Sequence, residues 1–364
     1  MASSLVGLFK SNASLQLGID VGASAVKVVA LERSGKGYRL MGLGWEETPP
    51  GAVVDGSLSD TKTIAQVVTA ALKQTKLNYK GASAAVGLRG INVVFKRISI
   101  PFQGIAELGK QVVLEAQQHV DSDLSNWEID YEPIGEPTTE GQIAILLVAA
   151  RKSVVEQYVE MLKQVGVRPA VLDCDAFAMS NSLELIIPDD SKTLLCIDVG
   201  RDSTKIHLTI RGQTSIIRSL PIGGAHFTDL LSRQLGINHV EAETLKWSIG
   251  NPDFAQSHPE IAEICKQHTF ELCEEIKKTM EFYAGMETSA AIRDIDAIVL
   301  SGGGSVVPGL SEGISTLMNA DTVYASPFRG MELTSKEQET VTSRYSHQFA
   351  VATGLALRRE GDKE

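Results

Sequence analysis

The fold of this chain is decided by one stretch near its beginning, Leu17-Gly18-Ile19-Asp20-Val21-Gly22-Ala23-Ser24-Ala25-Val26-Lys27-Val28-Val29-Ala30-Leu31. Its apolar pattern on both sides of Gly22 predicts two strands joined by a tight turn. Gly22 has no Cβ, so a ligand can approach the backbone, and successive N–H groups of such a turn suit phosphate oxygens. Asp20 stands where a carboxylate would hold hydrated Mg²⁺. Taken alone, an Asp-x-Gly turn is more often a plain turn.

The same pattern returns half a chain length later, in Leu195-Cys196-Ile197-Asp198-Val199-Gly200-Arg201-Asp202-Ser203-Thr204-Lys205. Both copies hold Asp-Val-Gly followed by a lysine at the same spacing. Two matching strand–turn–strand units predict a duplicated fold whose halves face each other. Such a pair of turns would supply two carboxylates and two sets of backbone donors to one triphosphate.

Composition narrows the class of protein. A chain of 364 residues is long enough for two domains or one large two-lobed domain. The net charge of −11 argues against wide contacts with nucleic acid. No run reaches the roughly 18 apolar residues that span a bilayer, and the apolar cluster in residues 1–12 is too short for a secretory signal. The four cysteines lack metal-binding spacing, so we expect buried, reduced thiols.

The first half of the chain reads as strand, strand, strand, helix, strand, which is one half of a ribonuclease-H-like fold. Residues 98–167 then interrupt that half as a β-α-β-β-α block. Its last helix, 152–165, carries an apolar stripe that we expect to bury against the block's own short sheet. The block should therefore be a small inserted subdomain.

The second half opens with the repeated turn and continues with helices at 226–236, 239–248 and 258–292. A buried strand, 297–300, then leads into a glycine triplet, where the backbone can lie flat against a planar or phosphorylated ligand. A terminal helix is expected at 345–358. We expect four parts: a first-lobe core (1–97 and 168–188), an inserted subdomain (98–167), a second-lobe core (189–228 and 285–364) and a helical subdomain (229–284).

With these motifs, the chain resembles the actin-like ATPase superfamily and, more narrowly, the PilM family of type IV pilus assembly proteins, which is related to FtsA. The resemblance covers nearly the whole chain and includes Leu8-Phe9-Lys10 and Pro50-Gly51-Ala52-Val53-Val54-Asp55-Gly56. It implies an α/β, actin-like (ribonuclease-H-like) two-lobed ATPase fold with an inserted β-α-β-β-α subdomain in the first lobe. ATP and Mg²⁺ would bind between the lobes.

The resemblance also implies the residues of the site. The first phosphate loop would be Asp20, Gly22, Ala23, Ser24 and Lys27, the second Asp198, Gly200, Ser203 and Thr204, and the adenosine loop Gly302, Gly303, Gly304 and Ser305. Asp20 and Asp198 would be the metal-binding carboxylates. Glu243 and Lys246 would pack against adenosine, with a surface salt bridge as the equal alternative. Asp173 and Asp175 would lie near the attacking water as candidate catalytic residues, with helix capping as the alternative.

Ala23 stands where many relatives carry Ser or Thr, and Arg201 and Asp202 differ from the small residues common in the second loop. Contacts through backbone N–H groups would survive both changes, so the resemblance implies ATP binding with slow hydrolysis at most.

The implied partner is the N-terminal cytoplasmic tail of PilN, an inner-membrane pilus protein, which would lie as an extended peptide beside the inserted subdomain. The pilus motor ATPases are further implied partners. The protein would then be cytoplasmic, associated with the inner membrane through its partners, and would serve pilus assembly and twitching motility.

Two alternatives stay open. An FtsA-like protein would carry an amphipathic C-terminal helix, whereas 358–364 is short and charged. A small-molecule kinase of the superfamily, for sugar or acetate, would need a catalytic base facing a substrate pocket between the lobes, and we find no sugar-binding signature.

Overall fold

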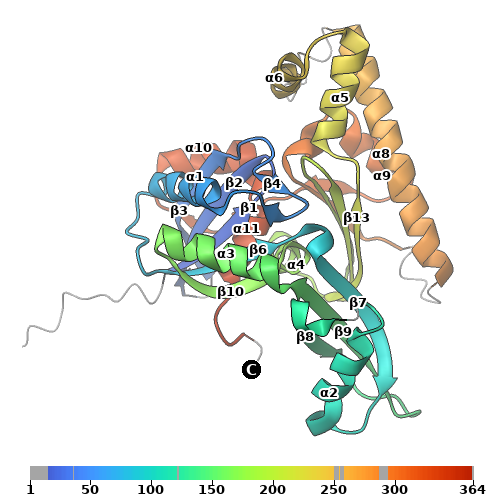
Figure 1. Cartoon of the computed structure of the whole chain (residues 1–364). Helices are drawn as coiled ribbons and strands as arrows, with labels where there is room; N and C mark the ends of the chain where they lie inside the picture. The colour runs from blue at the N-terminus through green and yellow to red at the C-terminus, as the bar shows by residue number, and fades with distance from the viewer. Residues whose placement is uncertain are drawn as a thin grey trace, which may run out of the picture.

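The computed structural model describes residues 15–35, 37–120, 123–249, 254, 258–286 and 294–362. The expected N-terminal motif at residues 8–10 lies outside the described residues. Two mixed sheets form the frame, one with strand order β10-β6-β1-β2-β3-β16 and the other β13-β12-β11-β14-β15. The order β6-β1-β2-β3 of the first sheet repeats in the second as β14-β11-β12-β13, so the predicted duplication and the actin-like α/β fold are confirmed (Figure 1).

The first sheet is assembled around the hairpin of β1 and β2. Its members are β1 (Gln16–Val21), β2 (Ala25–Ser34), β3 (Gly37–Glu47), β6 (Ser83–Leu88), β10 (Arg168–Cys174) and β16 (Glu332–Leu333). Helix α1 (Thr61–Gln74) packs on this sheet and begins at Asp60, whose side chain accepts the N–H groups of Lys62 and Thr63. A small hairpin of β4 (Val53–Val54) and β5 (Ser57–Leu58) precedes the helix.

The second sheet repeats this hairpin in the same register. Its members are β11 (Thr193–Val199), β12 (Thr204–Ile210), β13 (Gln213–Leu220), β14 (Ala297–Ser301) and β15 (Thr322–Tyr324). Asp198 pairs with Lys205 across β11 and β12, as Asp20 pairs with Lys27 across β1 and β2. The two Asp-Val-Gly turns therefore join the ends of equivalent strands in the two sheets.

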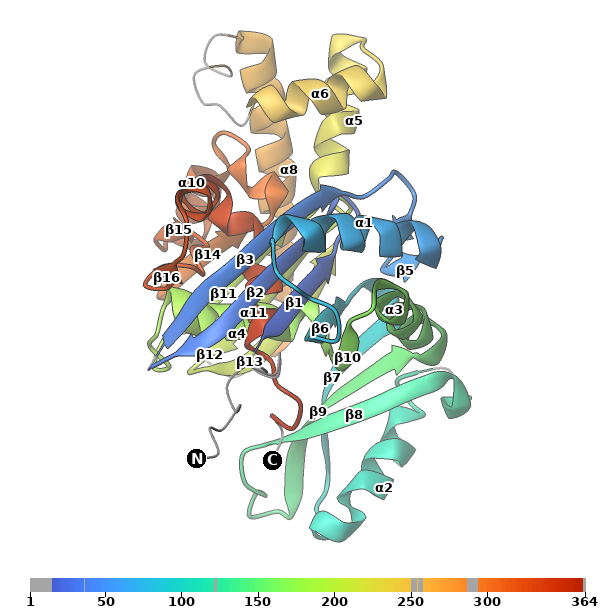
Figure 2. The ribbon, with the colours of Figure 1, turned by 90° about the vertical axis from the view of Figure 1, so that its left-hand side faces the viewer.

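Helices of the second half rise beyond its sheet, at the end opposite to the insert (Figure 2). They are α5 (Gly224–Leu235), α6 (His239–Ile249) and α8 (Pro259–Met286); α9 (Leu310–Met318) and α10 (Lys336–Tyr345) follow β14. The rest of the helix expected at 258–292 lies outside the described residues. Among those that are described, no helix has the length and apolarity that crossing a membrane requires. All four cysteines are buried and free, as predicted.

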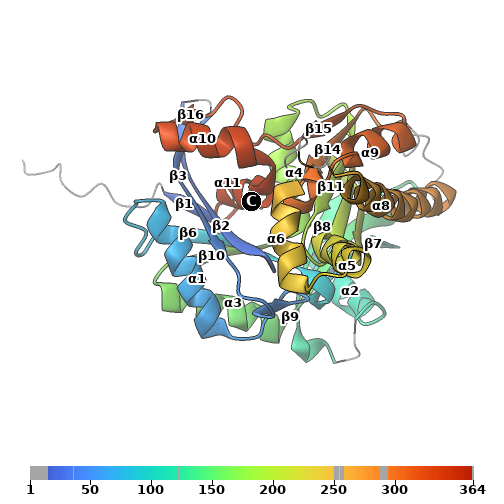
Figure 3. The same cartoon turned by 90° about the horizontal axis from the view of Figure 1, so that it is seen from above.

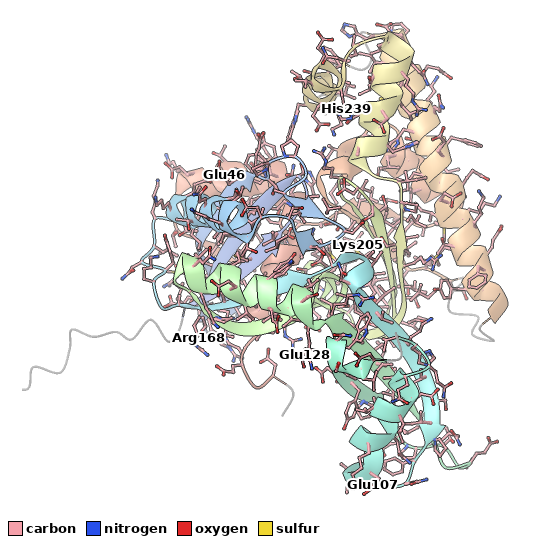
Figure 4. All side chains as sticks on the ribbon, viewed as in Figure 1. Glu46, Glu107, Glu128, Arg168, Lys205 and His239 are labelled. Atoms are coloured by element: carbon pink, nitrogen blue, oxygen red, sulfur yellow. The ribbon has the colours of Figure 1, made fainter. Side chains whose placement is uncertain are left out.

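The insert is a three-stranded sheet, β7-β9-β8, with one covering helix. It consists of β7 (Val93–Pro101), α2 (Ile105–Ala116), β8 (Trp127–Ile134) and β9 (Gln142–Arg151), and α3 (Lys152–Val165) follows it. In Figure 4 the labelled Glu107 marks α2, away from the main body, and Glu128 marks the start of β8, close to α3. Its core, which includes Ile98, Leu108 and Ile145, is separate from that of the first lobe.

Helix α3 does not pack as the sequence predicts. Its buried residues Tyr158, Met161 and Leu162 belong to the first-lobe core, and the helix lies against α1. The expectation that helix 152–165 buries its stripe in the insert's own sheet is therefore wrong. The insert uses α2 instead, because Leu108, Val112 and Ala116 already cover that face of the sheet.

Helices α4 (Asp175–Ile186) and α11 (Ala350–Leu357) lie against each other between the two sheets (Figure 3). The helix expected at 345–358 is interrupted, because α10 ends at Tyr345 and a 3₁₀ turn separates it from α11. The C-terminal part of the expected second-lobe core contacts the first sheet: β16 pairs with β3, and α11 packs on β1. The lobe boundaries drawn from the sequence stay a prediction.

Candidate nucleotide-binding cleft

A cleft with a volume of about 950 Å³ opens between the two halves. Its walls include parts of both Asp-Val-Gly turns, the glycine triplet after β14, and α6. The structure thus brings together most of the residues that the sequence predicts for the site: Asp20, Gly22, Ala23, Ser24, Lys27, Asp198, Gly200, Glu243, Lys246, Gly302, Gly303 and Gly304.

The first turn is closed by its own backbone and by one buried threonine. The N–H of Gly22 donates to the carbonyl of Ala25 at 3.1 Å. Thr48, at the end of β3, donates its hydroxyl to the carbonyl of Gly22 at 2.7 Å and its N–H to that of Ser24 at 3.0 Å. A Cβ on Gly22 would lie 2.7 Å from the Ala25 carbonyl oxygen, so glycine is needed at this position.

The second turn is closed in the same way, with the N–H of Gly200 donating to the carbonyl of Ser203 at 3.0 Å. The start of α5 holds it from outside, because the N–H of Gly224 donates to the Gly200 carbonyl at 2.9 Å. Ser203 and Thr204 do not line the cleft. The buried Thr204 donates its hydroxyl to the carbonyl of Ile222 at 2.6 Å, so it supports the turn.

The glycine triplet presents bare backbone to the cleft. Gly302 has a φ of 86°, and a Cβ there would overlap the Val199 carbonyl, so glycine is required by the fold itself. A Cβ on Gly303 would meet no atom within 4 Å, so this position opens onto empty space. Ser305 is fully buried and donates its hydroxyl to the carbonyl of Gly302 at 2.7 Å, so it holds the loop without reaching the cleft.

Glu243 and Lys246 form the salt bridge of the second alternative, at 2.7 Å, and both residues also line the cleft. Their packing against adenosine stays a prediction. Lys246 donates to the Thr228 hydroxyl at 2.9 Å, and that hydroxyl donates to Glu243 at 2.7 Å. Burial lowers the pKa of Lys246. Burial raises the pKa of Glu243, but hydrogen bonds from Lys246 and Thr228 outweigh this and lower it.

A chain of charged side chains starts in the lining of the cleft, with Asp20, Lys27 and Arg89, and continues to two residues that do not line it, Asp175 and Lys205. Asp20 pairs with Lys27 at 3.3 Å and with Arg89, and Arg89 reaches Asp175 through Nε at 3.0 Å. Asp175 in turn pairs with Lys205, which Figure 4 labels on β12. Burial by itself raises the pKa of Asp20, but the cations around it, Arg89 foremost, lower it to about 2. Asp20 is therefore ionised throughout the physiological range.

Of the two predicted catalytic carboxylates, Asp175 alone joins this charged chain. Asp173, near the end of β10, lies 3.5 Å from the Arg358 guanidinium, and its Oδ1 accepts the N–H of Cys174 at 2.8 Å. Neither Asp173 nor Asp175 is among the residues that line the cleft. Asp175 is bound to two cations, which leaves it poorly suited to accept a proton from water.

The two expected metal-binding carboxylates differ in their surroundings. Both oxygens of Asp20 contact cations of the protein, which does not suit a direct metal ligand. Asp198 lines the cleft next to the glycine triplet, and within the described part of the chain no ion pair engages it. In that same part no three acidic, histidine or cysteine side chains gather as a metal cage. Of the two, Asp198 is therefore the carboxylate more available to the water shell of a Mg²⁺ ion, and the metal-binding roles of both residues stay a prediction.

Known proteins resemble this chain over nearly its whole length. A family model described as "Type IV pilus assembly protein PilM" matches residues 18–360. The chain belongs to the PilM family. A solved structure described as "PilM-PilN type IV pilus biogenesis complex" is 26% identical and covers 96% of this chain and 98% of that chain, with a TM-score of 0.82. The resemblance to PilM predicted from the sequence is thus confirmed.

More distant relatives share less with this PilM-family chain. The cell division protein FtsA of Bacillus subtilis (strain 168) is 22% identical over 356 residues, which are 87% of this chain and 80% of FtsA. MreB 5 of Spiroplasma citri bound to AMPPNP is 13% identical, with a TM-score of 0.54 over 93% of this chain and 94% of that chain. The MreB likeness shows the fold alone.

Sequence reasoning missed several residues that line the cleft of this PilM-family chain. Arg89 directly follows the buried strand β6, and a charged residue at the end of a buried strand was the signal for it. Trp45 and Trp247 lie on β3 and α6, from opposite halves. Nothing in their local sequence marks them, because only the fold brings β3 and α6 together.

Proposed function

We propose that this PilM-family chain is the actin-like, nucleotide-binding component of a type IV pilus assembly machine. It binds ATP with Mg²⁺ between its lobes and the N-terminal cytoplasmic tail of PilN at the inserted subdomain. Through these two ligands it links the inner-membrane pilus complex to the motor ATPases. The protein works in the cytoplasm, held at the inner membrane by its partners.

The observation that carries the nucleotide part is the convergence of two Asp-Val-Gly turns and a glycine triplet on one cleft of about 950 Å³. That volume lies within the range of ligand and cofactor sites, about 300–1,000 Å³. Asp198 supplies the carboxylate for the water shell of the metal. Because Asp175 is bound by Arg89 and Lys205, ATP serves mainly as a ligand that clamps the lobes, with slow hydrolysis at most.

The PilN part is supported by the similarity to the solved PilM-PilN complex, which extends over 96% of this chain. The insert offers a suitable surface. Helix α2 covers one face of its sheet, and on the other face Phe95 and Val148 pack against the first-lobe core while Leu146 and Ala144 stay half-buried. An extended tail lying across this second face would gain apolar contacts, and it would gain backbone hydrogen bonds where it also pairs with an edge strand of the sheet, β7 or β8.

Calorimetric titration with ATP in the presence of Mg²⁺ tests the nucleotide part. The wild-type protein should bind, and Asp198→Asn should weaken binding about tenfold, since a charged metal contact of about 1.4 kcal/mol is lost. Asp190→Asn, which removes an exposed acid in a loop, should bind as wild type. If wild type fails to bind ATP, the proposal is wrong.

A deletion tests the PilN part. Phe95 and Val148 are register partners in β7 and β9, so an Asn-Gly turn can join them and replace residues 96–147. All of the separate insert core is then removed, and α3 stays in place. ATP binding should persist while a synthetic PilN-tail peptide no longer binds. Peptide affinity retained by the deletion variant would place the docking surface elsewhere.

A further inference from the structure

Two cations of the charged chain, Lys27 and Arg89, line the cleft, and both are paired with Asp20, which lines it too. Asp175 and Lys205 belong to the same chain of ion pairs but are not among the residues that line the cleft. The side chains of Lys27 and Arg89 are at most 17% exposed, so water screens their charges poorly. Both cations can therefore attract an anion bound in the cleft.

Arg89 is the member of the chain whose position is fixed most firmly. Its guanidinium bridges the two carboxylates, Asp20 through Nη2 and Asp175 through Nε. The third nitrogen, Nη1, is turned toward the first turn and lies 3.5 Å from the place that a Cβ on Gly22 would occupy. The side of the guanidinium that the carboxylates leave available thus faces the first Asp-Val-Gly turn.

The backbone of Arg89 is clamped by the β4–β5 hairpin. A Cβ on Gly56 would overlap the Arg89 carbonyl, and a Cβ on Gly90 would overlap the carbonyl of Asp55, so the two segments touch through glycines. Asn92 donates its amide to the Asp55 carbonyl at 3.0 Å, and the buried Tyr158 donates its hydroxyl to that of Gly56 at 3.1 Å. These contacts make Arg89 a preorganised side chain.

We propose that Arg89 binds the terminal phosphate of the nucleotide and makes the cleft selective for a nucleoside triphosphate over a diphosphate. The inference rests on the proposed nucleotide site and adds a specificity-determining residue to it. A guanidinium presents planar, charged donors to phosphate oxygens. Because two carboxylates hold it in place, little conformational freedom is lost when phosphate arrives.

The test compares the affinities for ATP and ADP, with Mg²⁺, of four proteins: wild type, Arg89→Gln, Arg89→Lys and the double variant Arg89→Gln/Asp175→Asn. The double variant removes one positive and one negative charge, so the net charge of the network of ion pairs does not change. Arg218→Gln, an exposed arginine on β13, is the matched control. Thermal unfolding of each variant reports whether it is folded.

Wild type and the Arg218→Gln control should prefer ATP to ADP by at least tenfold. The double variant should lose this preference through weaker ATP binding, with ADP affinity within about twofold of wild type, and Arg89→Lys should fall between. An unchanged ATP-to-ADP ratio in the folded double variant would overturn the inference and leave Arg89 a structural residue.

Inorganic tripolyphosphate separates this inference from the proposed function. It should raise the melting temperature of wild type and not that of the double variant, even if neither ATP nor ADP bound. That combination would refute the nucleotide function and uphold Arg89 as a phosphate ligand. No shift in wild type with any of the three ligands would refute both.

Discussion

Trp45 and Trp247 meet edge to face across the cleft, with ring centroids 6.5 Å apart and ring planes at 88°. Trp45 belongs to β3 of the first sheet and Trp247 to α6 of the second half, and both line the cleft. The pair is therefore a direct contact between the two halves beside the proposed nucleotide. Any ligand that changes the spacing of the halves also changes the surroundings of both indoles.

This pair predicts a fluorescence response. The third tryptophan, Trp127, is buried in the insert, so Trp127→Phe leaves only the two cleft indoles to emit. Titration of that variant with Mg²⁺ and ATP should change the emission in a saturable way. The double variant Trp45→Phe/Trp247→Phe, which keeps Trp127, should show no change in emission, although calorimetry still detects ATP binding. A full response in the double variant would contradict this prediction.

The glycine triplet predicts a selective loss of binding in Gly303→Val. Its Cβ and methyl groups would project into empty cleft space without meeting the protein, so the fold should survive. ATP affinity should fall at least about tenfold while the melting temperature stays close to that of wild type. Gly37→Val, at another open position outside the cleft, is the matched control. Normal ATP binding by Gly303→Val would reduce the loop to a connector.

Acid sensitivity follows from three buried histidines. Burial lowers the pKa values of His207, His268 and His347 to about 4, against 6.5 for the exposed imidazole. Between these values the unfolded chain binds more protons than the folded one. The stability that these three neutral histidines contribute is therefore fully present above pH 6.5. It is lost as the pH falls toward 4, by about 1.4 kcal/mol per pH unit for each histidine.

His268→Leu should make the protein less sensitive to acid. Within the described part of the chain neither ring nitrogen of His268 has a hydrogen-bond partner, so an apolar replacement leaves no partner unsatisfied. Urea unfolding at pH 6 and pH 5 should show a stability loss smaller than that of wild type by about 1.2 kcal/mol. An identical loss in both proteins would mean that the pKa of His268 is the same in the folded and the unfolded protein.

The contact between α4 and α11 predicts a large effect of a single methyl group. A Cβ on Gly354 would overlap the carbonyl of Ala178, and the buried Ser182 already donates its hydroxyl to the carbonyl of Ala350. Gly354→Ala should therefore cost about 1–3 kcal/mol or more in the free energy of unfolding. Gly285→Ala in α8 meets no atom within 4 Å and should be neutral or stabilising by up to about 1 kcal/mol. Equal stabilities in urea would contradict the close packing.

The sequence predicts the repeated hairpins well because their information is local. Asp20 and Asp198, with their partners Lys27 and Lys205 in register, stand where the two matching motifs place them. The cleft-lining glycines were predicted for the same reason, since their chemistry follows from the missing Cβ. These parts of the site need no knowledge of distant contacts.

The rest depends on contacts between segments far apart in the chain. The amphipathic stripe of 152–165 was correct, but an apolar stripe does not say which surface covers it, and α3 packs on α1. Arg89 became a candidate only when Asp175 and Asp20 were seen on either side of it. Likewise, the hydrophobic periodicity of residues 350–357 does not reveal that this helix, α11, packs on the first sheet.

The position of α11 restricts the order in which the parts of this protein can fold. Gly18 in the first strand lies so close to Ala352 that a Cβ would overlap the Ala352 carbonyl, so the earliest strand is covered by the last described helix. A nascent chain that lacks α11 exposes the apolar underside of its first sheet. Contacts of such long range form late in folding. The first lobe therefore completes its packing only after α11 has been synthesised, and products truncated before α11 keep an open apolar face that chaperones and proteases recognise.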